Sequence, residues 1–201
     1  MKTSIIILLF FAVGLLAGRL ELLPEAFEEK DLSRFALFAL MLLVGVSVGA
    51  NQNIFSLLKQ QGTKLLWVPL ATIVGTFAGA LLVHPLTNHA LLGETLAVGA
   101  GFGYYSLSSI IISEMYSEVL GVTALLANIT REVITLLLAP LMVIWLGKLS
   151  PIASGGATSM DTTLPIIVQS AGKDFAIMAV FHGIVLTVLV PVMVSFILSF
   201  L

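Results

Sequence analysis

Apolar residues run along this chain in long blocks, and short polar or glycine-rich turns separate the blocks. About 20 consecutive apolar residues are enough to cross a bilayer as a helix. A stretch such as SIIILLFFAVGLLAG also lacks the alternation of apolar and polar positions that a transmembrane β-barrel requires. The pattern therefore predicts an all-α polytopic membrane protein. We expect about seven transmembrane segments, near residues 3–22, 34–52, 63–83, 91–112, 119–147, 155–171 and 174–200.

Two of these segments carry polar, glycine-rich stretches at membrane depth. Segment 155–171 opens with GGATSMDTTLP, and segment 91–112 contains GAGFGYYSLSS. Irregular backbone is tolerated inside a membrane only where protein buries it or where it lines a water-filled cavity. We therefore predict that 155–171 is a broken or re-entrant helix, unwound near Gly155–Gly156 and again around Pro165. Paired interrupted segments are typical of an inverted-repeat transporter fold, although no internal repeat is visible in the sequence.

Composition agrees with this interpretation and excludes several other classes. The 201 residues are 59% hydrophobic and 10% charged, with a mean hydropathy of +1.12 and a formal net charge of −2. The chain has no cysteine, which excludes disulfides, thiolate metal sites and cysteine nucleophiles. No basic patch indicates nucleic acid, and no histidine–acid cluster has metal-site spacing. The connections are short, so we expect one transmembrane domain over residues 1–201.

Three ionisable residues fall inside predicted spans. Arg131 and Glu132 lie in the middle of LLANITREVITLLLAP, and Asp161 lies in the interrupted segment. A charge at the centre of a membrane helix costs about 2.5–3.5 kcal/mol even on lenient scales. Asn128 and Glu132 are four residues apart and share a helix face. This pattern predicts a polar strip, facing a hydrated cavity opposite Asp161, that binds substrate or protons.

The sequence leaves two interpretations of these charges open. Arg131 pairs with Glu132 or Asp161 and locks helices together, or it takes part in transport; one arginine neutralises only one of the two acids. A carboxylate between a desolvating environment and a nearby cation can exchange protons with substrate. Sodium is the rival coupling ion, because unwound carbonyls and hydroxyls can coordinate it; we expect protons, and no cofactor or metal. The hydroxyls concerned are those of Thr158, Ser159, Thr162 and Thr163.

Five further side chains are secondary candidates. Glu114 is either a solvated acid or part of the site, and His182 either a packing residue or part of the polar pathway. Tyr104 and Tyr105 gate a cavity or belong to an interfacial aromatic belt, and Ser106 follows them on the same segment. No nucleophile elbow, zinc-protease motif or phosphate-binding loop is present, and no second aspartate sits where an intramembrane protease would need it. We therefore expect a protein that is not an enzyme.

Four motifs together resemble the bacterial lysine exporter family. They are GFGYYSLSS at 101–109, NITREV at 128–133, GATSMDTTLP at 156–165 and FHGIVLTVLVP at 181–191. The resemblance runs in the same order from about residue 35 to the C-terminus, and Tyr104 stands where the family has tryptophan. It implies export of L-lysine and toxic lysine analogues, dependent on two intramembrane acids that fall here on Glu132 and Asp161. A channel or structural subunit of a membrane complex is the alternative.

The resemblance also bears on partners and location. Family members carry further transmembrane segments ahead of the position of Met1, so it implies a separate small membrane subunit that supplies them, or a homo-oligomer. The implied location is the bacterial cytoplasmic membrane. Lysines and arginines are divided equally between the two sets of loops, and we expect the N-terminus inside and the C-terminus outside.

Overall fold

The structure is a computed structural model that describes residues 35, 39, 42, 46, 65–87 and 90–201. The chain divides into two compact units, Met1–Ala39 and Leu40–Leu201, and the helices below all belong to the second unit. The predicted segments 3–22 and most of 34–52 lie outside the described residues. A single domain over 1–201 and the inverted repeat stay predictions.

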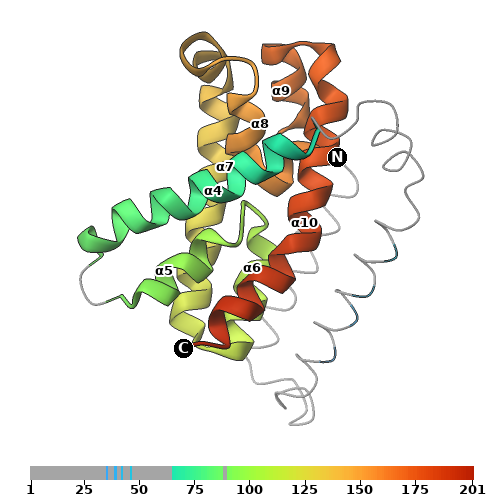
Figure 1. The fold of residues 1–201 in the computed structure, drawn as a ribbon. Coiled ribbons are helices and arrows are strands. Elements are labelled where there is room, and N and C mark those ends of the chain that lie inside the picture. Colours follow the sequence, from blue (N-terminus) through green and yellow to red (C-terminus); the bar gives the residue numbers. More distant parts are fainter. Residues whose placement is uncertain (1–34, 36–38, 40–41, 43–45, 47–64, 88–89) are drawn as a thin grey trace, which may run out of the picture. The chain divides into compact units, whose positions relative to one another are not determined.

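The described part is helical throughout, without a strand in residues 65–87 or 90–201, which confirms the predicted all-α class (Figure 1). Its α-helices are α4 (Trp67–Val83), α5 (Leu92–Gly99), α6 (Tyr105–Met115), α7 (Glu118–Leu146), α8 (Ser150–Gly155), α9 (Leu164–Ala171) and α10 (Ala176–Leu198). Helix α4 is crossed against α8 and α10, while α6 lies alongside α7 and α10. Three 3-10 turns join them, namely η3 (His84–Leu86), η4 (Gly156–Met160) and η5 (Lys173–Phe175).

Within residues 65–87 and 90–201, three stretches are long and apolar enough to cross a membrane. They are Trp67–Leu86, Glu118–Leu146 and Lys173–Leu198. Helix α7 also presents large apolar side chains outward; Leu137 and Trp145 are 71% and 75% exposed. In water such surface is costly, whereas in lipid it is the expected outer face. The chain is therefore an α-helical membrane protein.

The interrupted segments differ in detail from the sequence prediction. The segment predicted as 91–112 is two helices, α5 and α6, with a break between Gly99 and Tyr105. The segment predicted as 155–171 begins earlier, with α8 at Ser150. The helix is interrupted at Gly156, as predicted. The unwound stretch ends before Pro165, however, because Pro165 lies in the first turn of α9. Proline suits that position because its missing N–H has no partner there anyway.

Close helix contacts occur at glycines of α7 and α10. A Cβ atom at Gly121 would overlap Ser113 Oγ of α6, and one at Gly183 would lie 2.7 Å from the Ala157 carbonyl oxygen of η4. By contrast, a Cβ at Gly75 of α4 would meet no described atom within 4 Å. In the described part, small residues therefore bring α6 against α7 and η4 against α10.

The Glu94 carboxylate connects two parts of the described bundle through hydrogen bonds. Glu94 accepts a hydrogen bond from the Leu91 backbone N–H at 2.7 Å, at the start of α5, and another from the Tyr116 hydroxyl at 2.8 Å. The second bond raises the pKa of Tyr116, because losing the proton would break it. These contacts join α5 to the connection between α6 and α7.

Candidate functional site

The first break in the helices lies between α5 and α6. Phe102 has φ 44° and Gly103 has φ 90°, a left-handed conformation that suits glycine and strains a larger residue. The Phe102 side chain is fully buried and its ring packs edge-on against Phe77 at 5.7 Å. The packing of the Phe102 side chain thus holds the break in place.

The second break lies between α8 and α9. Gly156 has φ 62°, and the chain continues as η4 before α9 begins. The break frees carbonyls that an uninterrupted helix would use, and nearby hydroxyls bind two of them. Thr158 Oγ1 donates to the Gly155 oxygen at 2.8 Å, and Ser159 Oγ lies 2.7 Å from the Gly156 oxygen.

The two breaks lie directly against each other. The Ala157 N–H donates to the Phe102 carbonyl oxygen at 2.8 Å. A Cβ at Gly103 would lie 2.9 Å from the Gly155 oxygen, and one at Gly156 would overlap the Phe102 oxygen. Only residues without a side chain allow this approach of backbone to backbone. Two stretches about 55 positions apart in the sequence thereby form one polar region.

Helix α7 binds both breaks with side chains from one stripe. Asn128 Oδ1 accepts from the Gly103 N–H at 2.7 Å, in the first break. One turn later Arg131 donates to backbone of α8, and Thr135 Oγ1 lies 2.7 Å from Ser154 Oγ, near the second break. Side chains at this spacing share a helix face. The polar strip predicted from the sequence therefore serves in part as the support of both breaks.

We expect Asn128→Ala to lower the free energy of unfolding by about 1–3 kcal/mol. The substitution leaves the buried Gly103 N–H without its acceptor, and an unpaired buried backbone group costs about that much. Denaturation of the purified protein in mixed micelles measures the loss. Thr123→Ala is the control, because Thr123 is exposed on the same helix and bonds only the Val119 oxygen. Equal stability of the two variants would contradict the role of Asn128.

Glu132 projects from the same part of α7 but supports neither break. Its side chain is 8% exposed, and its carboxylate makes no hydrogen bond with a residue of the ranges 65–87 or 90–201. A nearly buried carboxylate is costly without hydrogen-bond donors, and the described residues supply none, which makes Glu132 the strongest candidate for a group that binds something else.

Asp161 lies at the end of η4, where the chain turns toward α9. It is exposed, and its Oδ1 accepts from the Thr162 N–H at 2.6 Å and from Thr162 Oγ1 at 3.3 Å. The charges of both acids act on the Tyr105 hydroxyl, and that of Asp161 acts on Tyr104 as well. Tyr105 thus lies near both acids, and Tyr104 lies near Asp161. A water-filled cavity between the acids stays a prediction.

Within the described residues, Arg131 makes its hydrogen bonds with two backbone carbonyls and a threonine hydroxyl, not with a carboxylate. Nε donates to the Ser154 oxygen at 2.8 Å and Nη2 to the Ala153 oxygen at 2.9 Å, while Nη1 lies 3.4 Å from Thr76 Oγ1. Neither Glu132 nor Asp161 accepts a bond from it. The alternative in which Arg131 pairs with one of these acids therefore finds no contact in the described part of the chain.

His182 is fully buried and bonded through both ring nitrogens. Nδ1 lies 3.0 Å from Ser159 Oγ, and Nε2 lies 2.9 Å from Thr72 Oγ1. Ser159 Oγ also lies within bonding distance of two carbonyl oxygens, which need its single proton. Ser159 must therefore accept from the histidine, so that Nδ1 carries the proton and Nε2 accepts from Thr72. In this arrangement His182 joins α10 and η4 to α4.

The remaining candidates are spread around the breaks. Thr158 and Thr163 are buried with their hydroxyls 3.4 Å apart, whereas Thr162 and Ser106 are exposed. Glu114 is half-buried in the last turn of α6, and no bond links it to either break. In the described ranges no three histidine, cysteine, aspartate or glutamate residues are grouped as a metal site would require.

Sequence reasoning missed two threonines of α4. Thr72 binds His182 and Thr76 approaches Arg131. The two are four residues apart in an otherwise apolar helix. This spacing places both hydroxyls on one helix face and could have indicated a polar contact.

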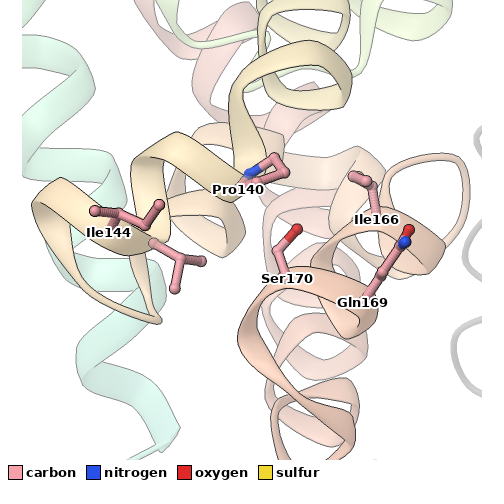
Figure 2. Close-up of a pocket in the computed structure, with 6 residues that line it drawn as sticks. Pro140, Ile144, Ile166, Gln169 and Ser170 are labelled. Atoms are coloured by element: carbon pink, nitrogen blue, oxygen red, sulfur yellow. The ribbon is translucent and has the colours of Figure 1, made fainter.

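A separate pocket of about 400 Å³ opens between α7 and α9 (Figure 2). Ser170 and Gln169 of α9 and Pro140 of α7 lie around it, as Figure 2 shows, and neither of the two acids lines it. The pocket therefore does not belong to the acidic site.

Two helix breaks that meet at one polar region, among helices of membrane-spanning length, are an arrangement typical of α-helical membrane transporters with broken helices. A family model described as "Lysine exporter LysO" matches residues 8–198. The chain belongs to this lysine exporter family, which confirms the resemblance seen in its motifs.

Two relatives are similar over most of this chain. The lysine exporter LysO of Escherichia coli (strain K12) is 31% identical over 198 residues, which cover 98% of this chain and 63% of that protein. A putative lysine exporter of Haemophilus influenzae is 31% identical over 170 residues, covering 83% of this chain and 84% of that protein. The chain thus spans under two thirds of the length of the Escherichia coli relative. No solved structure matches it.

Proposed function

We propose that this chain exports L-lysine, and toxic lysine analogues, across the bacterial cytoplasmic membrane as a secondary active transporter. The observation that carries the proposal is Glu132, a nearly buried carboxylate on α7 without a described hydrogen-bond donor. We infer the identity of the substrate from the family, because its model and the Escherichia coli relative are named lysine exporters. Lysine offers two ammonium groups, and an ammonium is a partner that the described residues do not give this carboxylate.

We propose Glu132 and Asp161 as the pair that binds substrate and protons in turn. An acid must lose its proton to bind an ammonium and regain one when the substrate leaves. Lysine carries a net charge of +1, and moving one charge out of a negative interior costs about 2.3 kcal/mol per 100 mV. Inward movement of one proton per lysine makes the exchange electroneutral and removes that cost. We propose that Tyr104 and Tyr105, which lie near these acids, contact the substrate.

Protons suit the second break better than sodium does. A sodium site there would need free carbonyls and hydroxyls. The Thr158 and Ser159 hydroxyls are instead engaged with the carbonyl oxygens of the break. This arrangement supports proton antiport. An inner-membrane location, an N-terminus inside, and a further membrane subunit or a second copy as partner belong to the same proposal.

Lysine flux in proteoliposomes tests the function. We expect labelled lysine to exchange with unlabelled lysine in a saturable way, which a channel or structural subunit does not support. Net efflux should rise several-fold when the outside is made acid by one pH unit, because such a gradient is worth about 1.4 kcal/mol per proton. A sodium gradient of the same size should leave it unchanged, and empty liposomes give the baseline. Sodium-driven efflux would contradict proton coupling, and absence of exchange would contradict the function.

A further inference from the structure

The break after α8 leaves the carbonyls of residues 153–156 outside the regular helix pattern. The last carbonyls of any helix lack intrahelical partners and carry the negative end of the helix dipole. Each of the four finds a side-chain donor. Hydroxyls reach Gly155 and Gly156, and the Arg131 guanidinium bonds the other two, at 2.8 and 2.9 Å.

The guanidinium lies against the break itself. A Cβ at Gly156 would lie 3.4 Å from Arg131 Cζ, and Nη1 approaches Thr76 of α4 at 3.4 Å. Arginine stays protonated in proteins, so a permanent positive charge lies where carbonyls of a half-helix converge. In transporters with broken helices this is the position at which such carbonyls coordinate the coupling cation.

We propose that Arg131 is a positioning residue that acts as a tethered cation. It fills the carbonyl site of the second break, holds η4 and Asp161 in place, and leaves that site closed to a soluble coupling ion. This inference rests on the proposed function. It assigns Arg131 neither to the neutralisation of Glu132 nor to the carboxylate of the substrate, because its described bonds go to two backbone carbonyls and the Thr76 hydroxyl.

Two variants separate this role from substrate binding. Arg131→Gln removes the charge, and Arg131→Lys keeps a cation that can still donate to carbonyls. Lys148→Gln is the control, because it removes an exposed positive charge outside the site. Hydrogen exchange of the full chain in detergent should rise about tenfold or more over residues 153–161 in Arg131→Gln, since charge-assisted bonds are lost. Arg131→Lys should change less, and Lys148→Gln should match the unmodified protein.

Lysine transport gives a second readout. We expect Arg131→Gln to lower the maximal rate about tenfold or more with KM within about threefold, because the break is displaced but the acids remain. In Arg131→Ala, which leaves space, millimolar guanidinium chloride should restore part of the rate and tetramethylammonium chloride should not.

Two results would overturn the role of Arg131. One is unchanged exchange over 153–161 in Arg131→Gln. The other is a KM raised about 100-fold at an unchanged maximal rate, as loss of a substrate-carboxylate partner predicts. The hydrogen-exchange measurement needs no transport, so it tests the role of Arg131 even if the unmodified protein moves no lysine. A protein that moves no lysine would count against the proposed function alone.

Discussion

Glu132→Gln is expected to abolish lysine efflux, lowering the rate by at least about 100-fold. The proposed pair consists of Glu132 and an ammonium group of the bound lysine. Removing one member of a buried charge pair costs about 3–5 kcal/mol, and each 1.4 kcal/mol corresponds to a factor of ten in the rate. The variant is close to isosteric, and Glu132 forms no hydrogen bond with a described residue that the substitution would break. Efflux of labelled lysine from proteoliposomes, at equal protein content, measures the effect.

Asp161→Asn should cause a comparable loss, because the proposed exchange of substrate and protons needs both acids. Asparagine retains an Oδ1 that accepts from the Thr162 N–H, so the local turn keeps its bond while the charge disappears. Glu118→Gln is the matched control, because Glu118 is an exposed acid in the first turn of α7. An exposed charge at a helix end is worth about 0.3–1 kcal/mol in stability. We therefore expect this variant to keep more than about half of the efflux. Intact efflux in both Glu132→Gln and Asp161→Asn would disprove the assignment of the acids.

Gly156→Ala is expected to lower the free energy of unfolding by about 2–5 kcal/mol. The left-handed conformation of residue 156, at φ 62°, costs a residue with a Cβ about 1–2 kcal/mol. The added carbon also overlaps the Phe102 oxygen, and overpacking adds about 1–3 kcal/mol. Because Phe102 O accepts the bond from Ala157, relieving the overlap separates the two breaks.

Thermal unfolding in detergent measures this effect, and we expect Tm to fall by about 5–15 °C. Gly75→Ala is the matched control, since the same carbon meets no described atom within 4 Å in α4 and alanine favours helix by about 1 kcal/mol. The two glycine variants should therefore change Tm in opposite directions. A Gly156→Ala protein as stable as the unmodified chain would show that the breaks do not depend on this contact.

Much of the architecture follows from local pattern. The apolar blocks predict the membrane helices, and the glycine-rich stretches predict two interruptions, because glycines, hydroxyls and an aspartate cannot continue a lipid-facing helix. Cost of burial selects Glu132 and Asp161 from the other acids. The boundaries of the elements are less well predicted. Segment 91–112 is two helices, and the unwound stretch predicted around Pro165 ends before this residue.

The sequence by itself determined the class of this protein, its two interrupted helices, its family and the acids that merit testing. Each of these depends on residue type and on spacing along one helix. Only the tertiary structure decided what each polar residue of α7 faces. Spacing places Asn128, Arg131 and Glu132 near one another, but it does not say whether an arginine meets a carboxylate or the end of a half-helix. That choice depends on how α8 and the Gly101–Tyr104 turn pack against α7, through backbone contacts between residues about 55 positions apart.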